Sequence, residues 1–132
     1  MTDVSIVRRL PNVEVIAFSV NNINTLEPFA ACKNLQELYL RQNKIKDINE
    51  LVYLMDLPYL RSLWLAENPC AEFPNYRMTV LKALPNLEIL DNIKVTPEEV
   101  RDAEREGNDL FTDDGNQEET IQESNYSKSN NI

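Results

Sequence analysis

The feature that most limits how this chain can fold is a pattern of apolar residues that occurs three times. The pattern is L-x-x-L-x-L-x-x-N-x-L with modest hydrophobic replacements, and it fits VEVIAFSVNNI (13–23), LQELYLRQNKI (35–45) and LRSLWLAENPC (60–70). A fourth segment, LEILDN (87–92), begins the pattern and then stops. The four starts are separated by 22, 25 and 27 residues. The chain is therefore expected to consist of stacked copies of one structural unit.

Both the pattern and its spacing are typical of leucine-rich repeats, which have a period of about 20–29 residues. In each repeat a short strand turns alternate residues into the core. The expected inward pairs are Ile16 and Phe18, Leu38 and Leu40, and Leu63 and Leu65. A single repeat does not bury its own apolar face, so the units must stack. The sequence predicts an α/β leucine-rich-repeat solenoid, with short parallel strands on the concave face, helical or 3-10 segments on the convex face and a helical cap at the C-terminal end.

The asparagine position of the pattern is occupied by Asn21, Asn43 and Asn68. The chain turns off the strand at this position, where buried backbone groups need hydrogen-bond partners. An asparagine amide both donates and accepts hydrogen bonds. We therefore expect a structural ladder of asparagine side chains, in which the loss of one costs about 1–3 kcal/mol.

The segments between the strands continue the apolar spacing and return the chain to the start of the next strand. The second return, NELVYLMDLP, is three residues longer than the first and is expected to hold more helix, with Asn49 as its N-cap. Cys32 and Cys70 fall at core positions of their repeats, so we expect two small buried hydrophobic side chains. Two cysteines without metal-ligand spacing, and no signal peptide at MTDVSIVRR, favour an intracellular protein.

Both ends of the repeat array give information. At the start, MTDVSIVRRLPNV aligns with IKDINELVYL, so residue 1 falls inside a repeat whose strand does not precede it. We expect either a truncated first repeat or an exposed edge strand. At the other end, NYRMTVLKALPNLEILD is expected to form a helical cap followed by a last short strand. The residues assigned to this cap are Tyr76, Arg77, Val80, Leu81 and Leu84.

The expected division of the chain has three parts. Residues 1–96 form the repeat domain with its cap. Residues 97–106 form a terminal helix, because Thr96 and Glu99 can make a capping box and Gly107 can end the helix. Residues 107–132 are expected to be an acidic, polar and disordered tail.

The composition argues against several functions. Residues 1–96 carry 10 basic and 11 acidic side chains and residues 97–132 carry 3 and 11, so the net charge of −9 arises almost wholly from the C-terminal end. A domain with no basic field is not expected to bind nucleic acid directly. The chain has no histidine and only two glycines, Gly107 and Gly115. We therefore expect no catalysis, no metal, no cofactor and no membrane insertion, and predict a protein-binding module or scaffold.

The strand positions that face away from the core form the predicted partner-binding surface. It consists of Val15, Ala17, Ser19, Glu37, Tyr39, Arg41, Ser62, Trp64, Ala66 and Asp91. Tyr39 and Trp64 are expected to be neighbours on adjacent strands. An exposed tyrosine beside the only tryptophan, with Arg41 adjacent, has the composition of an interface hot spot. The alternative is that the two rings pack on each other beneath Arg41 and Glu67 without any ligand.

Four segments resemble a known family: SVNNINTLEP, LQELYLRQNKI, LWLAENPC and YRMTVLKALPNLEILDN…VTPEE. They are similar to the cilia- and flagella-associated protein 410 family, and the resemblance runs from about Thr2 to Glu104. It implies a protein of the cytoplasm and cytoskeleton at the basal body of the cilium, required for cilium assembly and cytoskeletal organisation. The resemblance also implies contact with a kinase related to the never-in-mitosis-A group. That contact is associated with a C-terminal helical module that does not occur in residues 107–132.

Other classes of leucine-rich-repeat protein remain open at this point. One is a nuclear subunit of U2-snRNP type that holds an RNA-binding protein, which would place the chain in the nucleus. Another is an adaptor similar to the axonemal dynein light chains. Acidic nuclear leucine-rich phosphoproteins are a third, although their tails are denser in Asp and Glu than this one.

Overall fold

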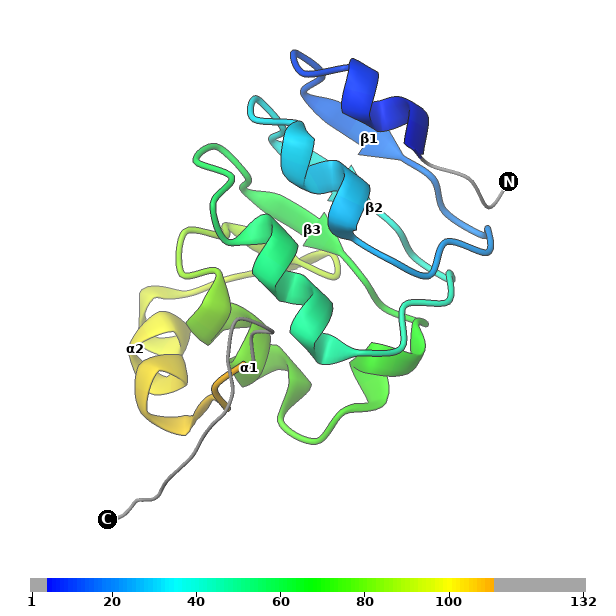
Figure 1. The fold of residues 1–132 in the computed structure, drawn as a ribbon. Coiled ribbons are helices and arrows are strands. Elements are labelled where there is room, and N and C mark those ends of the chain that lie inside the picture. Colours follow the sequence, from blue (N-terminus) through cyan, green and yellow to red (C-terminus); the bar gives the residue numbers. More distant parts are fainter. Residues whose placement is uncertain (1–4, 111–132) are drawn as a thin grey trace, which may run out of the picture.

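The computed structural model of the chain describes residues 5–110 as a short solenoid with a C-terminal cap (Figure 1). The elements in chain order are the 3-10 helix η1 (Ser5–Arg9), β1 (Val15–Ala17), η2 (Glu27–Ala31), β2 (Glu37–Tyr39), η3 (Ile48–Leu54), β3 (Ser62–Trp64), η4 (Pro69–Glu72), α1 (Tyr76–Ala83), β4 (Ile89–Leu90), β5 (Ile93–Lys94) and α2 (Pro97–Glu106). The 3-10 helices η1, η2 and η3 lie side by side on one face of the sheet (Figure 1). The predicted leucine-rich-repeat fold is confirmed.

The strands form one sheet in the order β1-β2-β3-β4-β5. The first four pair in parallel, and equivalent repeat positions lie opposite each other, as in the pairs Leu38↔Leu63 and Tyr39↔Trp64. The last strand, β5, is antiparallel to β4 and was not predicted. Asp91 and Asn92 connect these two strands with φ values of 53° and 66°. Positive φ at both central residues is the geometry of a two-residue hairpin turn, which reverses the chain here.

The core lies between the sheet and the convex helices. Its largest fully buried side chains are Phe29, Ile23, Leu26, Leu35, Leu38, Leu40, Ile45, Leu51, Leu54, Leu63, Leu65 and Leu81. The expected inward positions of the strands are buried, except that Phe18 at the first repeat is only partly covered. Full burial of one such side chain contributes about 1.5–3 kcal/mol, so this column of residues supplies most of the stabilisation.

Two asparagines form rungs between neighbouring repeats. The Asn43 side chain donates to the carbonyl oxygens of Phe18 and Leu40 and accepts from the backbone N–H of Ile23 at 3.1 Å. The Asn68 side chain repeats these contacts one unit later and accepts from Ile45 N–H at 3.0 Å. Each amide therefore ties the exit of its own strand to the repeat before it.

Asn21 occupies the same repeat position one unit earlier and is half-buried. Its side chain donates to the carbonyl oxygens of Phe18 and Ser19 within its own turn. The residue before each of the three asparagines has a positive φ, with values of 59° at Val20, 62° at Gln42 and 66° at Glu67. The turn off each strand thus requires a left-handed residue as well as an asparagine.

The longer second return does hold more helix, since η3 has seven residues and η2 has five. The predicted N-cap of η3 was wrong. The structure begins this helix with Asp47, whose side chain accepts from the backbone N–H of Asn49 at 2.9 Å. Both residue types cap helices well, and a carboxylate gains further from the partial positive charge at a helix N-terminus.

The cap consists of α1, the β4–β5 hairpin and α2. The predicted capping box is present: Thr96 Oγ1 accepts from Glu99 N–H, and the Glu99 carboxylate accepts from Thr96 N–H. Gly107 follows α2, and a Cβ at this position would lie 2.5 Å from the carbonyl oxygen of Met78. Such a close approach admits only glycine. Within residues 5–110, no helix is both long and apolar enough to cross a membrane.

The predicted boundary of the disordered tail at residue 107 was too early. The backbone N–H of Asn108 donates to Thr79 Oγ1 at 3.1 Å, and Leu110 packs against the hydrophobic core. These contacts make residues 107–110 part of the cap. The rest of the predicted tail, 111–132, lies outside the described residues.

Candidate protein-binding face

The candidate site is the face of the sheet that points away from η1, η2 and η3. Alternation along each strand buries Leu38 and Leu63 and turns Tyr39 and Trp64 toward the opposite side. The rings of Tyr39 and Trp64 meet edge to face, with centroids 6.5 Å apart and planes at 76°. Both side chains stay partly exposed. The predicted adjacency of the two rings is therefore confirmed, and the geometry is one that aromatic pairs favour.

Charged side chains flank this aromatic pair on both sides. On one side, Glu37 accepts from Tyr39 Oη and from Arg61, whose Nη2 lies 2.8 Å from the Glu37 carboxylate. The hydrogen bond to Glu37 raises the pKa of the Tyr39 hydroxyl. On the other side, Arg41 and Glu67 form an ion pair at 2.8 Å. The hydrogen bond to Glu37 fixes the Tyr39 hydroxyl, and the partly exposed ion pairs contribute little stability by themselves.

The other residues predicted for this face differ in their exposure. Val15 is 52% exposed, Ala17 and Ser19 are exposed, and Ala66 is partly exposed. Ser62 is only 4% exposed, because neighbouring side chains cover it. A partner that docks here would therefore meet Val15, Tyr39 and Trp64 before it met Ser62.

Asp91 does not belong to the exposed column in which the sequence placed it. The parallel strand β4 ends at Leu90, and Asp91 adopts a left-handed conformation. Its carboxylate accepts from the backbone N–H groups of Leu65 and Ala66 at 2.7 and 3.0 Å, and from Tyr76 Oη at 2.8 Å. Asp91 therefore closes the last turn of the solenoid and is a structural residue of the cap.

A second polar contact joins the helices of the cap. Arg77 on α1 binds the Glu99 carboxylate on α2 through Nε at 2.8 Å and through Nη2 at 3.0 Å. It also donates to the carbonyl oxygens of Leu90 and Lys94 at 3.3 Å. The hydrogen bonds from Arg77 lower the pKa of Glu99. A two-point arginine–carboxylate contact of this kind fixes the relative position of the two helices.

Neither cysteine is placed for chemistry. Cys32 and Cys70 are both buried and free. Burial raises the pKa of the Cys32 thiol, and burial together with nearby carboxylates raises the pKa of Cys70 to about 12. A thiol in this state is a poor nucleophile at neutral pH. Among residues 5–110, no three His, Cys, Asp or Glu side chains are grouped so that they could hold a metal ion.

Arg61 belongs to this face but was not among the residues that the sequence predicted for it. It immediately precedes β3, at the repeat position that Glu14, Gln36 and Glu88 occupy before their strands. Besides Glu37, it lies 3.8 Å from Glu88. The signal was available, because the residue before the first strand position is polar in all four repeats. The first column of the face is therefore bordered by a row of polar side chains.

These features define a capped leucine-rich-repeat module whose concave sheet face carries an aromatic pair. A family model described as "Leucine-rich repeat" matches residues 7–117, and the chain belongs to this family. Cilia- and flagella-associated protein 410 of Mus musculus is 56% identical over 112 residues, and the Homo sapiens protein of the same name is 54% identical over the same length. The matches cover 83% of this chain but only 45% and 44% of those relatives, so the chain spans less than half of their length.

More distant matches share the repeat architecture. Leucine-rich repeat-containing protein 23 of Homo sapiens is 40% identical over 96 residues, which is 72% of this chain and 28% of that protein. Among solved structures, the Drosophila melanogaster SNF/U2A' complex contains a chain that superposes with a TM-score of 0.68 at 26% identity. That match covers 73% of this chain and 56% of the other. The Mex67 LRR domain from Chaetomium thermophilum superposes with a TM-score of 0.57 at 24% identity and supports the fold alone.

Proposed function

We propose that this chain is a non-catalytic scaffold whose concave face docks a protein partner through Tyr39 and Trp64. The observation that carries the proposal is the edge-to-face pair of partly exposed rings on a sheet face that the convex helices do not cover. Tyrosine and tryptophan are the residues most enriched at interface hot spots, because each buries a large area at a small cost in conformational entropy.

The surroundings of the rings are suited to a protein ligand. Arg41 and Arg61 lie on either side of the pair, and each already binds a carboxylate of this chain. A partner can exchange those carboxylates for its own at little net cost, because partly exposed ion pairs are worth about 0–1 kcal/mol. The apolar Val15 extends the surface toward the open edge of β1. We therefore expect an interface with an aromatic centre and a charged rim.

The proposed setting is the base of the cilium, where such a scaffold would contribute to cilium assembly and cytoskeletal organisation. The support is the similarity to cilia- and flagella-associated protein 410 of mouse and human over 83% of the chain. The experiment is proximity labelling in ciliated cells with the unaltered chain and with the Tyr39→Ala/Trp64→Ala variant. We expect ciliary-base proteins, with a never-in-mitosis-A-related kinase as one candidate to score, to be labelled by the first and lost with the second. Equal labelling by both would contradict the assignment of the site.

A nuclear adaptor is the second candidate function. The observation that favours it is the TM-score of 0.68 to a chain of the Drosophila melanogaster SNF/U2A' complex. A tagged copy of this chain in a ciliated cell separates the two proposals. Signal at basal bodies supports the ciliary scaffold, nuclear speckles support the U2-type adaptor, and signal along the axoneme supports a dynein-type adaptor.

A further inference from the structure

The centre of the concave face meets a partner through side chains alone. β2 lies between β1 and β3, and β3 lies between β2 and β4, so the backbone groups of both strands are used within the sheet. The polar side chains beside the rings are engaged as well. Glu37 binds Tyr39 Oη and Arg61, and Arg41 binds Glu67. An occupant of this area therefore has to satisfy its own backbone N–H and C=O groups.

An α-helix satisfies its own backbone, and its dimensions match this face. Glu37 begins β2 and Arg41 follows its end, four residues later. Four residues of strand span about 13 Å, and a helix with its side chains is about 10–12 Å across. Neighbouring strands lie about 4.8 Å apart and a helix rises about 5.4 Å per turn, so a helix laid across the strands brings about one turn to each strand. An extended segment in the same place would bury unpaired backbone groups against the rings.

The apolar centre of the face spans three strands. Ala17 on β1, Tyr39 on β2 and Trp64 on β3 occupy equal positions in the register. The first and the third are two strand spacings apart, about 10 Å, so side chains at i, i+4 and i+7 of one helix reach all three. Ala17 is small and exposed beside the two rings. A larger apolar side chain of the partner therefore fits over β1.

The two rims of the face differ in charge. The side chains on the rim where the strands begin are Glu14, Gln36, Glu37, Arg61 and Glu88. Arg61 is the single cation among three carboxylates, and Glu14 is exposed and forms no ion pair within residues 5–110. Lys94 on β5 lies beyond the strands that carry the apolar centre. Since Arg41 and Glu67 balance each other on the opposite rim, the first rim favours basic residues of a partner.

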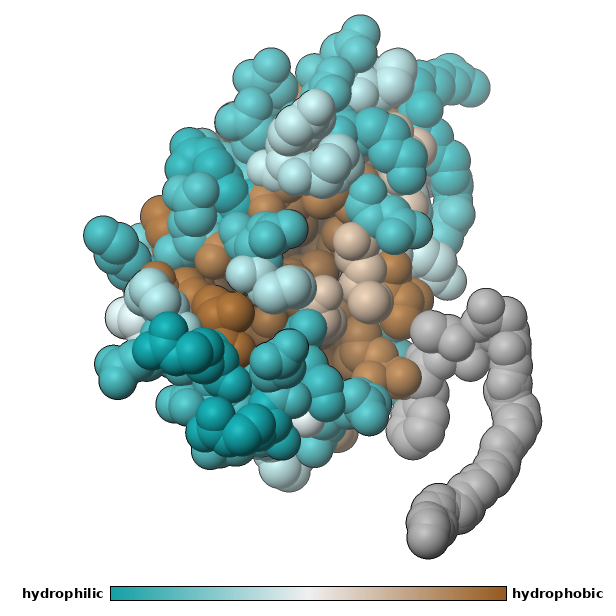
Figure 2. All heavy atoms as spheres, turned by 90° about the vertical axis from the view of Figure 1, so that its left-hand side faces the viewer, coloured by the Kyte–Doolittle hydropathy of each residue, from teal (hydrophilic) through white to brown (hydrophobic). Residues whose placement is uncertain are grey.

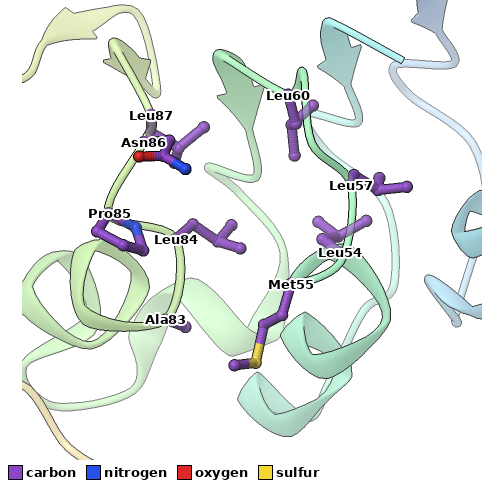
Figure 3. Close-up of a pocket in the computed structure, with 9 residues that line it drawn as sticks. All are labelled: Leu54, Met55, Leu57, Leu60, Ala83, Leu84, Pro85, Asn86 and Leu87. Carbon is purple, nitrogen blue, oxygen red and sulfur yellow. The ribbon is translucent and has the colours of Figure 1, made fainter. Parts of the chain in front are cut away.

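A second apolar area of the molecule does not offer such a site. Figure 2 views the side where the chain leads into the strands, and apolar residues gather in the middle of this side within a polar border. The leucines before β3 and β4 are at most 7% exposed, namely Leu57, Leu60, Leu84 and Leu87. The hollow between η3 and the loop from α1 into β4 has a volume of about 30 Å³, which is room for little more than a water molecule (Figure 3). This side is the flank of the core.

We propose that the docking element of the partner is an amphipathic α-helix laid across β1, β2 and β3. Its apolar stripe covers Ala17, Tyr39 and Trp64, and its basic flank lies over the rim where the strands begin. This assignment rests on the proposed function, because it names the kind of element that the same face receives. It specifies the partner segment as apolar at i, i+4 and i+7, with Lys or Arg along one flank.

The test places a photo-cross-linking amino acid at Ser19 or at Ala66 of the full chain in ciliated cells. The register of the strands continues to these positions, so they lie two strands apart on the same face, at about 10 Å. A helix rises about 1.5 Å per residue, and the two variants should therefore cross-link one partner segment at residues about six or seven apart. A spacing of about three residues, as in an extended chain, would overturn the helix and keep the docking face.

Asp56, which is exposed in the loop after η3, is the matched control position. Cross-linking from Ser19 and Ala66 that is no greater than from Asp56 would overturn docking on the concave face, and with it the proposed function. Cross-links to a second copy of the chain, or to partner residues scattered over several segments, would overturn the helix alone.

A tryptophan-free synthetic peptide with the sequence of the cross-linked segment provides a second measurement. Trp64 is the only tryptophan of the chain, so its fluorescence reports binding of the peptide. Proline in the middle of the apolar stripe breaks a helix and should weaken binding at least tenfold. Alanine at a neighbouring solvent-facing position is the control and should leave the affinity unchanged. Equal affinity of the proline peptide would overturn the proposal.

The basic flank is tested with Glu14→Gln. This change removes the unpaired carboxylate of the rim, so it should weaken peptide binding severalfold at low salt and less at high salt. Asp56→Asn removes a carboxylate in the loop after η3 and should have no effect. An affinity that Glu14→Gln leaves unchanged would overturn the assignment of the basic flank.

Discussion

Tyr39 and Tyr76 both donate their hydroxyl groups to a carboxylate, yet their surroundings differ. Tyr39 bonds to Glu37 on the open face of the sheet and keeps part of its ring exposed beside Trp64. Tyr76 bonds at 2.8 Å to Asp91, whose other oxygen accepts backbone hydrogen bonds of the last turn. Burial first, and the Asp91 charge second, raise the pKa of Tyr76, whereas the hydrogen bond to Glu37 is the main cause at Tyr39.

The different surroundings of the two tyrosines indicate that the cap and the concave face have different tasks within one repeat fold. In the cap, Asp91 accepts hydrogen bonds from backbone N–H groups, and Arg77 and Glu99 join two helices, so the loss of these groups costs stability. On the concave face, the polar groups bind each other at the surface and are free to change partners. A terminal cap of this kind is what a solenoid needs to end its core. Substitutions in the two regions should therefore affect different measurements.

The largest expected effect is in the apolar part of the cap. Leu81→Ala removes a fully buried side chain from α1 and should lower the free energy of unfolding by about 2–5 kcal/mol. Urea denaturation monitored by circular dichroism measures this change. The control is Ile93→Ala on β5, where a 59% exposed side chain should change stability by less than about 0.5 kcal/mol. A small effect of Leu81→Ala would show that the cap is not part of the cooperative core.

The next effect is at the acceptor that closes the last turn. Asp91→Ala leaves two backbone N–H groups and the Tyr76 hydroxyl without their acceptor and should cost roughly 2 kcal/mol. Asp91→Asn keeps one acceptor oxygen and should cost less. The ratio of the two losses in thermal unfolding tests whether Asp91 acts as a hydrogen-bond acceptor. Equal losses would assign its role to charge instead.

The contact between Arg77 and Glu99 gives the cap a pH dependence. The folded pKa of Glu99 is lowered by Arg77, so near pH 4 the unfolded chain binds more protons than the folded one. The stabilisation is complete above the ordinary glutamate pKa of about 4.3 and is lost as the pH falls through the lower folded pKa. Glu99→Gln should cost about 1 kcal/mol at neutral pH. The difference from the unaltered chain should vanish in acid; a difference that persisted there would contradict this origin.

The smallest effect is expected in the turn after β1, which belongs to neither region. Val20 is 59% exposed and has a φ of 59°, which a β-branched residue adopts only with strain. Val20→Asn should raise stability by about 0.5–1 kcal/mol, since asparagine tolerates this conformation. Calorimetry would detect the gain as a higher melting temperature. Partner binding should not change, so a loss of binding would extend the functional face to the strand-exit turns.

The parts of the fold that follow from local pattern were predictable. The strands follow from the alternation around Leu38 and Leu63, and the start of α2 follows from Thr96 and Glu99 three positions apart. The adjacency of Tyr39 and Trp64 followed from the equal register of the repeats. These features depend on residues close in sequence or at equal repeat positions.

The predictions from the sequence failed where the repeat pattern ends and where residues distant in sequence contact each other. The prediction extended the inward–outward alternation of the strand through Leu90 to Asp91. The left-handed turn at Asp91 and Asn92 instead ends the parallel strand and leads into β5. Both residue types tolerate that turn, so the Asp-Asn pair was a signal that could have been used. The bond between Arg77 and Glu99 joins residues 22 positions apart, and no local pattern predicts it.

The central claim is that binding depends on the concave face and stability depends on the cap. The most direct measurement compares Tyr39→Ala/Trp64→Ala with Tyr76→Phe, for partner capture from ciliated cells and for melting temperature. We predict that the first variant loses capture and melts close to the unaltered chain, while Tyr76→Phe melts lower and keeps capture at temperatures where it is folded. A large drop in the melting temperature of the double variant, with capture retained, would show that the two rings are a packing contact and would contradict the account.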